Sequence, residues 1–190
     1  NTDGFGVSSN ISVSTVCSYN GALYGGTVNL ILGTQVWRNT PRNIWYLAEG
    51  ATEGGFETWV LVQNPGTDPV HVDFTLNTGE GAVAPEPLQG VTIPAGSRRS
   101  FNIGEFVTTY DVSTKVECTD GDVICERAMY WTAPGSPYRE LGHDSIGINS
   151  PGAIWYLAEG ATEGGFETWV LVQNPGTDPV HVDFTLNTGE

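Results

Sequence analysis

The sequence contains one long segment twice. Residues 44–80 read IWYLAEGATEGGFETWVLVQNPGTDPVHVDFTLNTGE, and the same 37 residues return unchanged at 154–190, a spacing of 110 residues. A fixed period of this size matches one domain, and internal repetition of this kind indicates a tandem array of like units. The repeat therefore constrains the architecture before any single residue is considered.

The repeat divides the chain into three parts. We expect a partial, divergent β unit at 1–43, a complete repeat at 44–153 and the first half of an identical next repeat at 154–190. In an alternative frame, one domain spans 1–80 and a second spans 81–190. The two frames differ in which half-repeats fold together.

Apolar and polar residues alternate with a period of two inside the repeat. Val70, Val72, Phe74 and Leu76 are predicted to share one strand face, with polar residues between them. This alternation is typical of half-buried strands, and turn-forming Pro and Gly residues separate the runs. The predicted strands of one repeat lie at 44–48, 56–63, 70–77, 88–93, 97–103, 112–119 and 123–131. About seven antiparallel strands in a roughly 110-residue repeat predict an all-β fold of tandem immunoglobulin-like β-sandwiches.

The dipeptide Asp120-Gly121 lies between two of these predicted strands. Asp-Gly between two β-prone runs is a strong hairpin signal. We therefore expect the strands at 112–119 and 123–131 to pair with each other directly.

The charge balance excludes some classes of partner. Seven basic residues against 22 acidic ones give a net charge of −15. Binding of nucleic acid or of an anionic membrane surface requires clusters of Lys and Arg, so neither is expected as a partner. The sequence also has no apolar run of about 18 residues, the length needed to insert into a membrane as a helix.

Several motifs of the repeat together resemble a known family. They are Trp45–Gly50 (WYLAEG), Gly55–Trp59 (GFETW), Gln63–Gly66 (QNPG) and Ile93–Ser97 (IPAGS). This set resembles uncharacterised tandem repeats of large secreted or cell-surface bacterial proteins. The resemblance implies an immunoglobulin-like architecture and an extracellular location. That family has no established activity, so the resemblance implies no functional residues.

The three cysteines raise the question of disulfides. Cys118 and Cys125 flank the Asp120-Gly121 turn, and neighbouring strands bring β-carbons within reach of a disulfide. In a chain that resembles secreted proteins we expect this pair to form a disulfide; two free thiols are the alternative. Cys17 is the unpaired cysteine, either a thiol available for pairing between chains or a buried reduced one.

Metal and cofactor signals are weak. His71 and Asp73 share a predicted strand face, but two ligands do not make a site, and outward polar alternation explains both. The acidic turn Thr119–Asp122 lacks the ordered oxygen spacing of a known calcium loop, so calcium between repeats is only an alternative. We expect no cofactor.

Catalytic patterns are also weak. Gly142–Ser145 contains the letters of a catalytic triad, but residues adjacent in sequence cannot form its spatial relay. Glu49, Glu53 and Glu57 do not define the facing carboxylate pair that glycoside hydrolysis needs. We therefore expect that the chain is not an enzyme.

The tryptophans are the more informative side chains. Trp59 lies on the predicted strand face opposite Val60 and Val62, so that this strand is apolar on both sides. Trp59 is interpreted as packing under a loop of its own domain, against another repeat or chain, or as a platform for sugar stacking. Trp45 and Trp131, with the second-copy residues Trp155 and Trp169, are the other candidates for interface aromatics.

These observations favour an extracellular structural protein located at the cell surface. The chain would be a repeat unit of a filament, sheath, surface layer or adhesin stalk, with copies of itself as partners. Unpaired strand edges are templates for strand addition, so head-to-tail assembly by strand complementation is one expected mode. The alternative is a carbohydrate-binding or adhesive module of a surface protein, with a glycan as partner.

Overall fold

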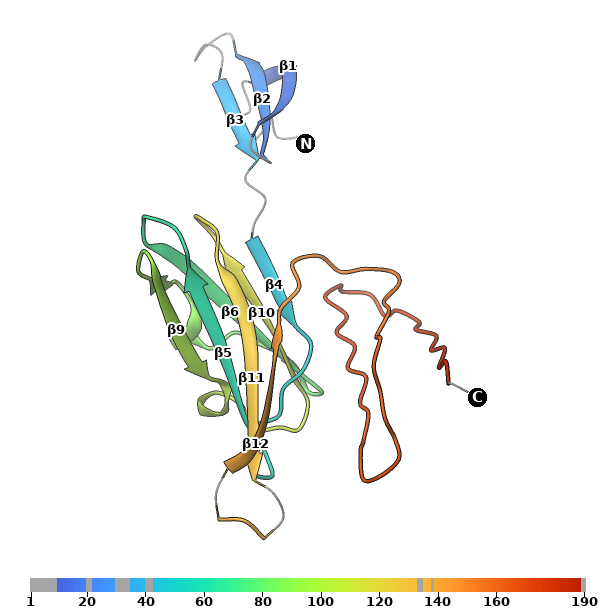
Figure 1. Cartoon of the computed structure of the whole chain (residues 1–190). Coiled ribbons are helices and arrows are strands. Elements are labelled where there is room, and N and C mark those ends of the chain that lie inside the picture. Colours follow the sequence, from blue (N-terminus) through green and yellow to red (C-terminus); the bar gives the residue numbers. More distant parts are fainter. Residues whose placement is uncertain are drawn as a thin grey trace. The chain divides into compact units, whose positions relative to one another are not determined.

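The computed structural model describes residues 10–19, 22–29, 35–39, 43–132, 135–137 and 139–188. Contacts divide the chain between Arg42 and Asn43 into two units, and each is described by itself (Figure 1). Apart from two short 3-10 helices, η1 (Glu86–Leu88) and η2 (Ile103–Glu105), every regular element among these residues is a β-strand. No helix among them is long and apolar enough to cross a membrane.

The first unit contributes one three-stranded sheet. Its strands are β1 (Asn10–Tyr19), β2 (Ala22–Asn29) and β3 (Gln35–Asn39), paired antiparallel in that order. In this register Cys17 lies opposite Tyr24. The side chain of Cys17 lies outside the described residues, and its pairing stays a prediction.

The second unit contains two antiparallel sheets, and we call residues 43–148 the two-sheet unit. One sheet has the order β4-β10-β6-β7, with β8 also paired to β6, and the other has the order β12-β11-β5-β9. The strands are β4 (Asn43–Leu47), β5 (Glu57–Asn64), β6 (Val70–Thr78), β7 (Gly81–Val83), β8 (Val91–Ile93), β9 (Ser97–Asn102), β10 (Val112–Cys118), β11 (Ile124–Thr132) and β12 (Arg139–Ile146). All-β, antiparallel structure was predicted from the sequence and is confirmed.

The apolar core forms from the inward faces of both sheets. On β6, Val70, Val72, Phe74 and Leu76 are buried, as their spacing predicts. Val60 and Val62 of β5 join them, and the rings of Phe74 and Phe101 lie 4.8 Å apart in the centre. Because side chains alternate along a strand, one face of each sheet is enough to build this core.

The prediction of a hairpin at Asp120-Gly121 is wrong. Cys118 of β10 pairs with Val72 of β6, whereas Cys125 of β11 pairs with Val62 of β5, so the connection crosses from one sheet to the other. Asp120 lies in this connection, and its Oδ1 accepts a hydrogen bond of 2.8 Å from the backbone N–H of His71 on β6. The aspartate thus ties the connection to the sheet that the chain has just left.

The two-sheet unit has two strands that the sequence pattern does not predict. The short β7 follows β6 through a tight turn, in which Thr78 pairs with Gly81 and Gly81 has a φ of +124°. Such a φ favours glycine. β12 pairs with β11 along its length, although its sequence RELGHDSI shows no apolar alternation. The predicted strand at 88–93 shortens to β8, because η1 ends at Leu88.

The second copy of the repeated segment forms no strand within residues 154–188. Its large apolar side chains are exposed, in contrast to the same letters in the first copy. The same sequence therefore has two conformations in this structure, with paired strands in the first copy and no strands in the second.

Candidate functional site

The clearest candidate site is the place where the first copy, residues 44–80, sits against residues 81–148, which we call the central half. The first copy supplies β4, β5 and β6, and no two of these strands pair with each other. β4 and β6 flank β10, while β5 lies between β11 and β9. Every strand of the first copy is therefore paired only with strands of the central half. We call the position between these strands of the central half the seat.

The need for partner strands explains why the second copy forms no strands. A strand needs a neighbour to satisfy its backbone N–H and C=O groups. The second copy contains the same three strand sequences, but these cannot pair with one another in the arrangement that the first copy uses. As a result Phe74 and Leu76 are 0% exposed, whereas their counterparts Phe184 and Leu186 are 60% and 82% exposed.

The turns of the two copies are nevertheless alike. Thr58 Oγ1 bonds the backbone N–H and C=O of Ala51 at 2.9 and 2.8 Å, and Thr168 bonds Ala161 at 2.8 and 2.9 Å. The Nδ2 of Asn64 donates to the Asp68 carbonyl at 2.8 Å, and Asn174 repeats this bond at the same length. These bonds are local in sequence. The segment therefore forms its turns alone and needs the seat only for its strands.

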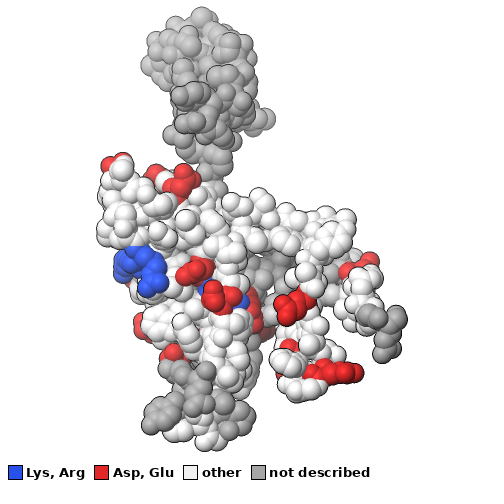
Figure 2. All heavy atoms as spheres, viewed as in Figure 1, with Lys and Arg blue, Asp and Glu red and all other residues white. Residues whose placement is uncertain are grey.

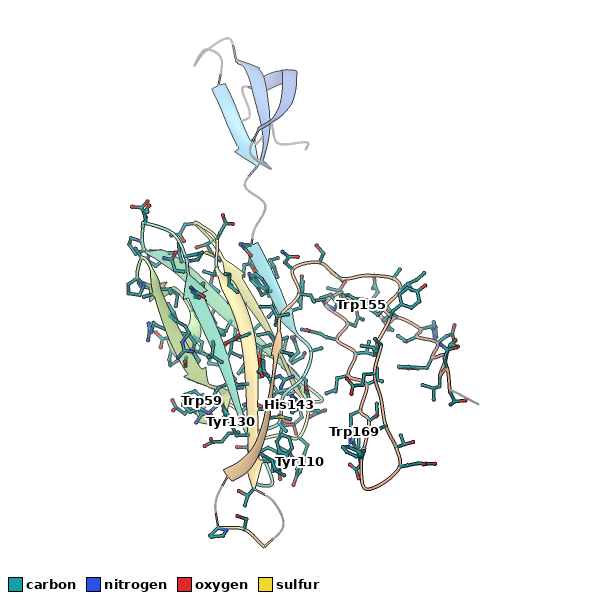
Figure 3. The ribbon with its side chains drawn as sticks, viewed as in Figure 1. Trp59, Tyr110, Tyr130, His143, Trp155 and Trp169 are labelled. Carbon is teal, nitrogen blue, oxygen red and sulfur yellow. The ribbon has the colours of Figure 1, made fainter. Side chains whose placement is uncertain are left out.

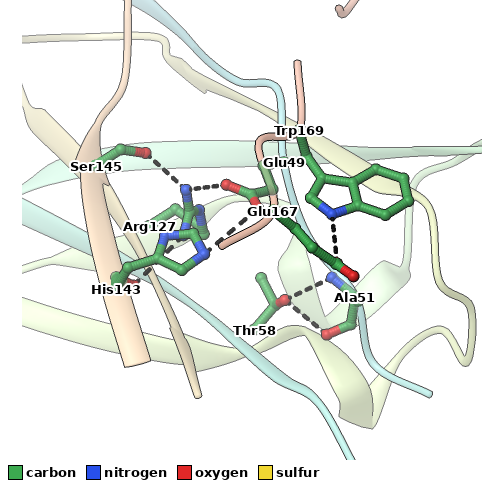
Figure 4. A network of polar contacts seen from close by, with 8 residues as sticks. All are labelled: Glu49, Ala51, Thr58, Arg127, His143, Ser145, Glu167 and Trp169. Carbon is green, nitrogen blue, oxygen red and sulfur yellow. Dashed lines mark hydrogen bonds and ion pairs between the residues drawn. The ribbon is translucent and has the colours of Figure 1, made fainter. Parts of the chain in front are cut away.

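One side chain of the first copy enters a buried polar network of the central half (Figure 4). Arg127 of β11 is only 3% exposed, and its Nη2 donates to Glu49 Oε2 at 2.5 Å and to Ser145 Oγ at 2.9 Å. Its Nη1 donates to Nδ1 of His143 at 2.9 Å, and His143 Nε2 lies 3.4 Å from Glu49 Oε1. The network joins the loop after β4 to β11 and β12.

Electrostatics make Arg127 dependent on Glu49. Burial lowers the pKa of the Arg127 guanidinium, and the negative charges of Glu49 and Asp144 oppose that effect. A buried charge without a partner is costly, so the carboxylate of Glu49 is what allows Arg127 to lie in the interior. The network is thus complete only when a copy occupies the seat, because the copy supplies the glutamate.

The two cysteines of the central half lie on opposite sheets. Cys118 and Cys125 are both buried in the core and are free thiols in this structure, so their disulfide stays a prediction. Burial raises the pKa of both thiols, and the neighbouring Cys118 raises the pKa of Cys125 further. Such thiols carry little thiolate at neutral pH.

The candidate tryptophans occupy different environments. Trp45 packs against the core, and its Nε1 is buried. The ring of Trp131 lies near two others, with centroid distances of 5.9 Å to Phe56 and 5.5 Å to His143. Trp59 is half-buried, and its counterpart Trp169 is 77% exposed. Trp155, also exposed, donates from Nε1 to the Gly152 carbonyl at 2.9 Å. Trp59 and Tyr130 both belong to the sheet that contains β5 and β11 (Figure 3).

The weaker sequence signals have structural roles where the chain is described. His71 pairs with Asp120 through Nδ1 and Oδ2 at 2.6 Å, and that hydrogen bond lowers the pKa of Asp120. Asp73 accepts from the backbone N–H of Gly90 at 2.6 Å. No group of three or more His, Cys, Asp or Glu side chains that could hold a metal ion is found among the described residues.

Sequence reasoning missed the network around Arg127. Nothing local marks this arginine, because Glu49 lies 78 residues away and His143 belongs to a strand that the pattern does not predict. The one available signal was its position: Arg127 lies two residues from both Cys125 and Met129 on β11, so the three side chains share the inward face. An arginine on such a face requires a buried acceptor.

We predict that Arg127→Met lowers the free energy of unfolding by about 3 kcal/mol, because it leaves Glu49, Ser145 and His143 without their shared donor. Arg98→Met is the matched control, since Arg98 is exposed on β9. Urea denaturation monitored by tryptophan fluorescence measures both. Equal losses in the two variants would show that the network does not stabilise the fold.

We also predict that, after reduction, Cys118 and Cys125 react with iodoacetamide at least roughly 100-fold more slowly in the native protein than in denaturant, because a buried thiol of raised pKa yields little thiolate. Mass spectrometry of peptides gives the rates. Fast native labelling of either residue contradicts the buried dithiol. Without reduction, a mass lower by two hydrogens identifies the disulfide.

Comparisons with known proteins add little about function. Residues 39–125 match a family of unknown function, DUF5719. No curated protein matches the chain. Among solved structures, the chain is similar to the crystal structure of Thermotoga maritima 1070, with 14% identity and a TM-score of 0.48 over 60% of this chain and 100% of that one. It is also similar to the Anabaena sensory rhodopsin transducer, with 18% identity and a TM-score of 0.39 over 47% of this chain and 97% of that one. At these TM-scores neither likeness carries an argument about this chain.

Proposed function

We propose that the chain is a repeat unit of an extracellular structural protein, built from tandem immunoglobulin-like sandwiches. It would form part of a filament, sheath, surface layer or adhesin stalk. The 110-residue spacing supports this proposal, because the two-sheet unit at 43–148 accounts for nearly one whole period. Repeat proteins of this kind stack units that contact mainly their neighbours.

The surface charge argues against nucleic acid as a partner. Acidic side chains are spread over the face shown in Figure 2, and the basic ones gather mainly at one place. With a net charge of −15, binding to phosphate is disfavoured. Protein partners that bring apolar strands of their own remain compatible with such a surface.

One observation carries the proposal: a segment that builds the core in its first copy exposes the same apolar side chains in its second. Large exposed apolar surface marks a site of interaction. The strand sequences of 154–188 have their complement in a central half. Strand addition between units would cover them, and such head-to-tail contact generates an open filament rather than a closed ring.

We predict ordered filaments in electron micrographs of the full chain at micromolar concentration, with an axial repeat of one or two domains. Leu186→Asp should reduce their number, because it places a charge on the exposed apolar face of the second copy. Images with and without reductant test whether Cys17 links chains. A wild-type chain that stays monomeric as its concentration rises would rule out self-assembly.

A carbohydrate-binding module is the second candidate function. Trp59 pairs with Ala128 and Glu57 pairs with Tyr130, so Trp59 and Tyr130 lie two residues apart on the same outer face. The Nε1 of Trp59 lies 3.5 Å from Glu57 Oε2. Aromatic rings beside a carboxylate, which can accept hydrogen bonds from hydroxyl groups, are compatible with sugar stacking.

This second function predicts a signal on a glycan array that Trp59→Ala abolishes. Trp169→Ala, the same substitution in the second copy, should leave the signal in place because Trp169 lacks the neighbouring strand β11. An array without any signal, or equal effects of the two variants, would reject the glycan-binding surface.

A further inference from the structure

We propose that the second copy can replace the first copy in the two-sheet unit of the same chain, so that the central half is a common seat for either. In one arrangement the unit is built from residues 44–148, as in this structure. In the other it is built from 81–188, with the first copy displaced. This inference concerns the pairing of half-repeats and does not depend on the proposed extracellular role.

The seat cannot distinguish the two copies by their side chains. Each residue of the second copy is identical to its counterpart in the first copy. The core positions of Val60 and Phe74 would be filled by Val170 and Phe184, and Glu159 would bring its carboxylate to Arg127. All side-chain contacts of the seated copy are therefore reproduced, and only the chain connections differ.

The connection between the central half and the second copy has the geometry that this exchange requires. Tyr46 and Ile148 form an antiparallel bridge, with backbone hydrogen bonds of 2.7 and 3.0 Å in the two directions. Continuing this register places Ser150 opposite the position of Ile44. The position of Ile44 belongs to Ile154 in the second copy, so residues 151–153 remain as the loop between them.

These three residues are Pro151-Gly152-Ala153. Three-residue loops that contain a glycine are common hairpin connections, and Pro favours a turn. Gly147 contributes as well, because a Cβ there would lie only 2.8 Å from Leu47 Cδ2 and 3.2 Å from the Trp45 ring. The absence of a side chain lets the segment before the loop lie against β4, and it would do the same against residues 154–157.

The second copy already has the turn conformations that the first copy has in the seat. Its turns have the hydrogen bonds of the first copy, and Gly164 and Gly165 have φ values of +66° and +87°, close to the +66° and +92° of Gly54 and Gly55. Segments that are ordered before binding lose less entropy when they bind. Only strand pairing has to form when the second copy enters.

The connections also explain which copy is seated here. The first copy is joined to the central half by the tight β6–β7 hairpin, in which only Gly79 and Glu80 lie between the paired residues Thr78 and Gly81. The second copy would be joined by the loop 151–153 instead. A shorter closure costs less entropy, so the first copy is favoured, and the preference is small because loop entropy changes slowly with length.

The test places a charge in the core position of one copy at a time, in the full chain. Phe74→Asp disables the first copy, and Phe184→Asp makes the same change in the second. We expect F74D to keep a native near-ultraviolet circular dichroism spectrum and a cooperative thermal transition, because the second copy takes the seat. The double variant should lose both, because neither copy can fill the core. If F74D alone unfolds as completely as the double variant, the exchange does not occur.

A cross-link identifies the seated copy directly. Lys115 of β10 lies opposite Thr75 of β6, on the outer face of the sheet, and Thr185 is the second-copy counterpart of Thr75. Cysteines at directly opposed positions of antiparallel strands can be bridged. In the F74D background, Lys115→Cys with Thr185→Cys should form a disulfide within one chain. The same pair with Phe74 intact should form far less of it.

The result that overturns the proposal is equally specific. A folded F74D chain without the link between positions 115 and 185 would show that the second copy does not occupy the seat. A link found only in dimers would show that the second copy comes from another molecule, which contradicts exchange within one chain. Filament formation by the wild-type chain is a separate measurement, so failure of the proposed function and failure of the exchange can be told apart.

Discussion

The structure depends on one constraint, the backbone hydrogen bonding between the first copy and the central half. β4, β5 and β6 alternate in the two sheets with strands from residues 81–148, and none of the three pairs with another. A strand without a neighbour leaves a row of N–H and C=O groups that only water or another chain can satisfy. Neither half can therefore form its sheets alone, and the core exists only where the halves interleave.

Burial follows from this interleaving rather than from the composition of either half. Val60 and Phe74 are fully buried because β10 and β11 hold their strands in two facing sheets. Burial of apolar area contributes about 25 cal/mol per Å², so the gain appears only when both halves are present. The burial of Arg127 depends on the same interleaving, because its carboxylate partner Glu49 belongs to the seated copy.

The sequence predicts well those structural features that are determined by residues close together in the chain. The inward face of β6 follows from alternation alone, and the structure confirms it. The hairpin at Asp120-Gly121 was wrong because turn chemistry does not say to which sheet the next strand belongs. Here the bond from His71 N–H to Asp120 holds the turn, and β11 pairs elsewhere. Prediction thus failed where pairing partners are distant in sequence.

The same division explains the candidate site. The repeat itself, visible in the sequence, identifies the segment concerned, but its seat could not be predicted because strand order is a property of the whole unit. β12 is the clearest case: RELGHDSI has no strand pattern, yet its pairing with β11 places His143 and Ser145 beside Arg127. A strand that is specified by its neighbour leaves little trace in its own residues.

A repeated half-domain adds a further consequence. Turns that are encoded locally appear in both copies, whereas strands that are encoded by their partners appear in one. In an array of such halves, each central half has an identical half-repeat on either side along the chain. Side-chain complementarity cannot choose between two identical segments, so the choice falls to the connections. In the exchange that we propose, the short β6–β7 turn and the loop 151–153 therefore decide which half-repeat pairs with the central half.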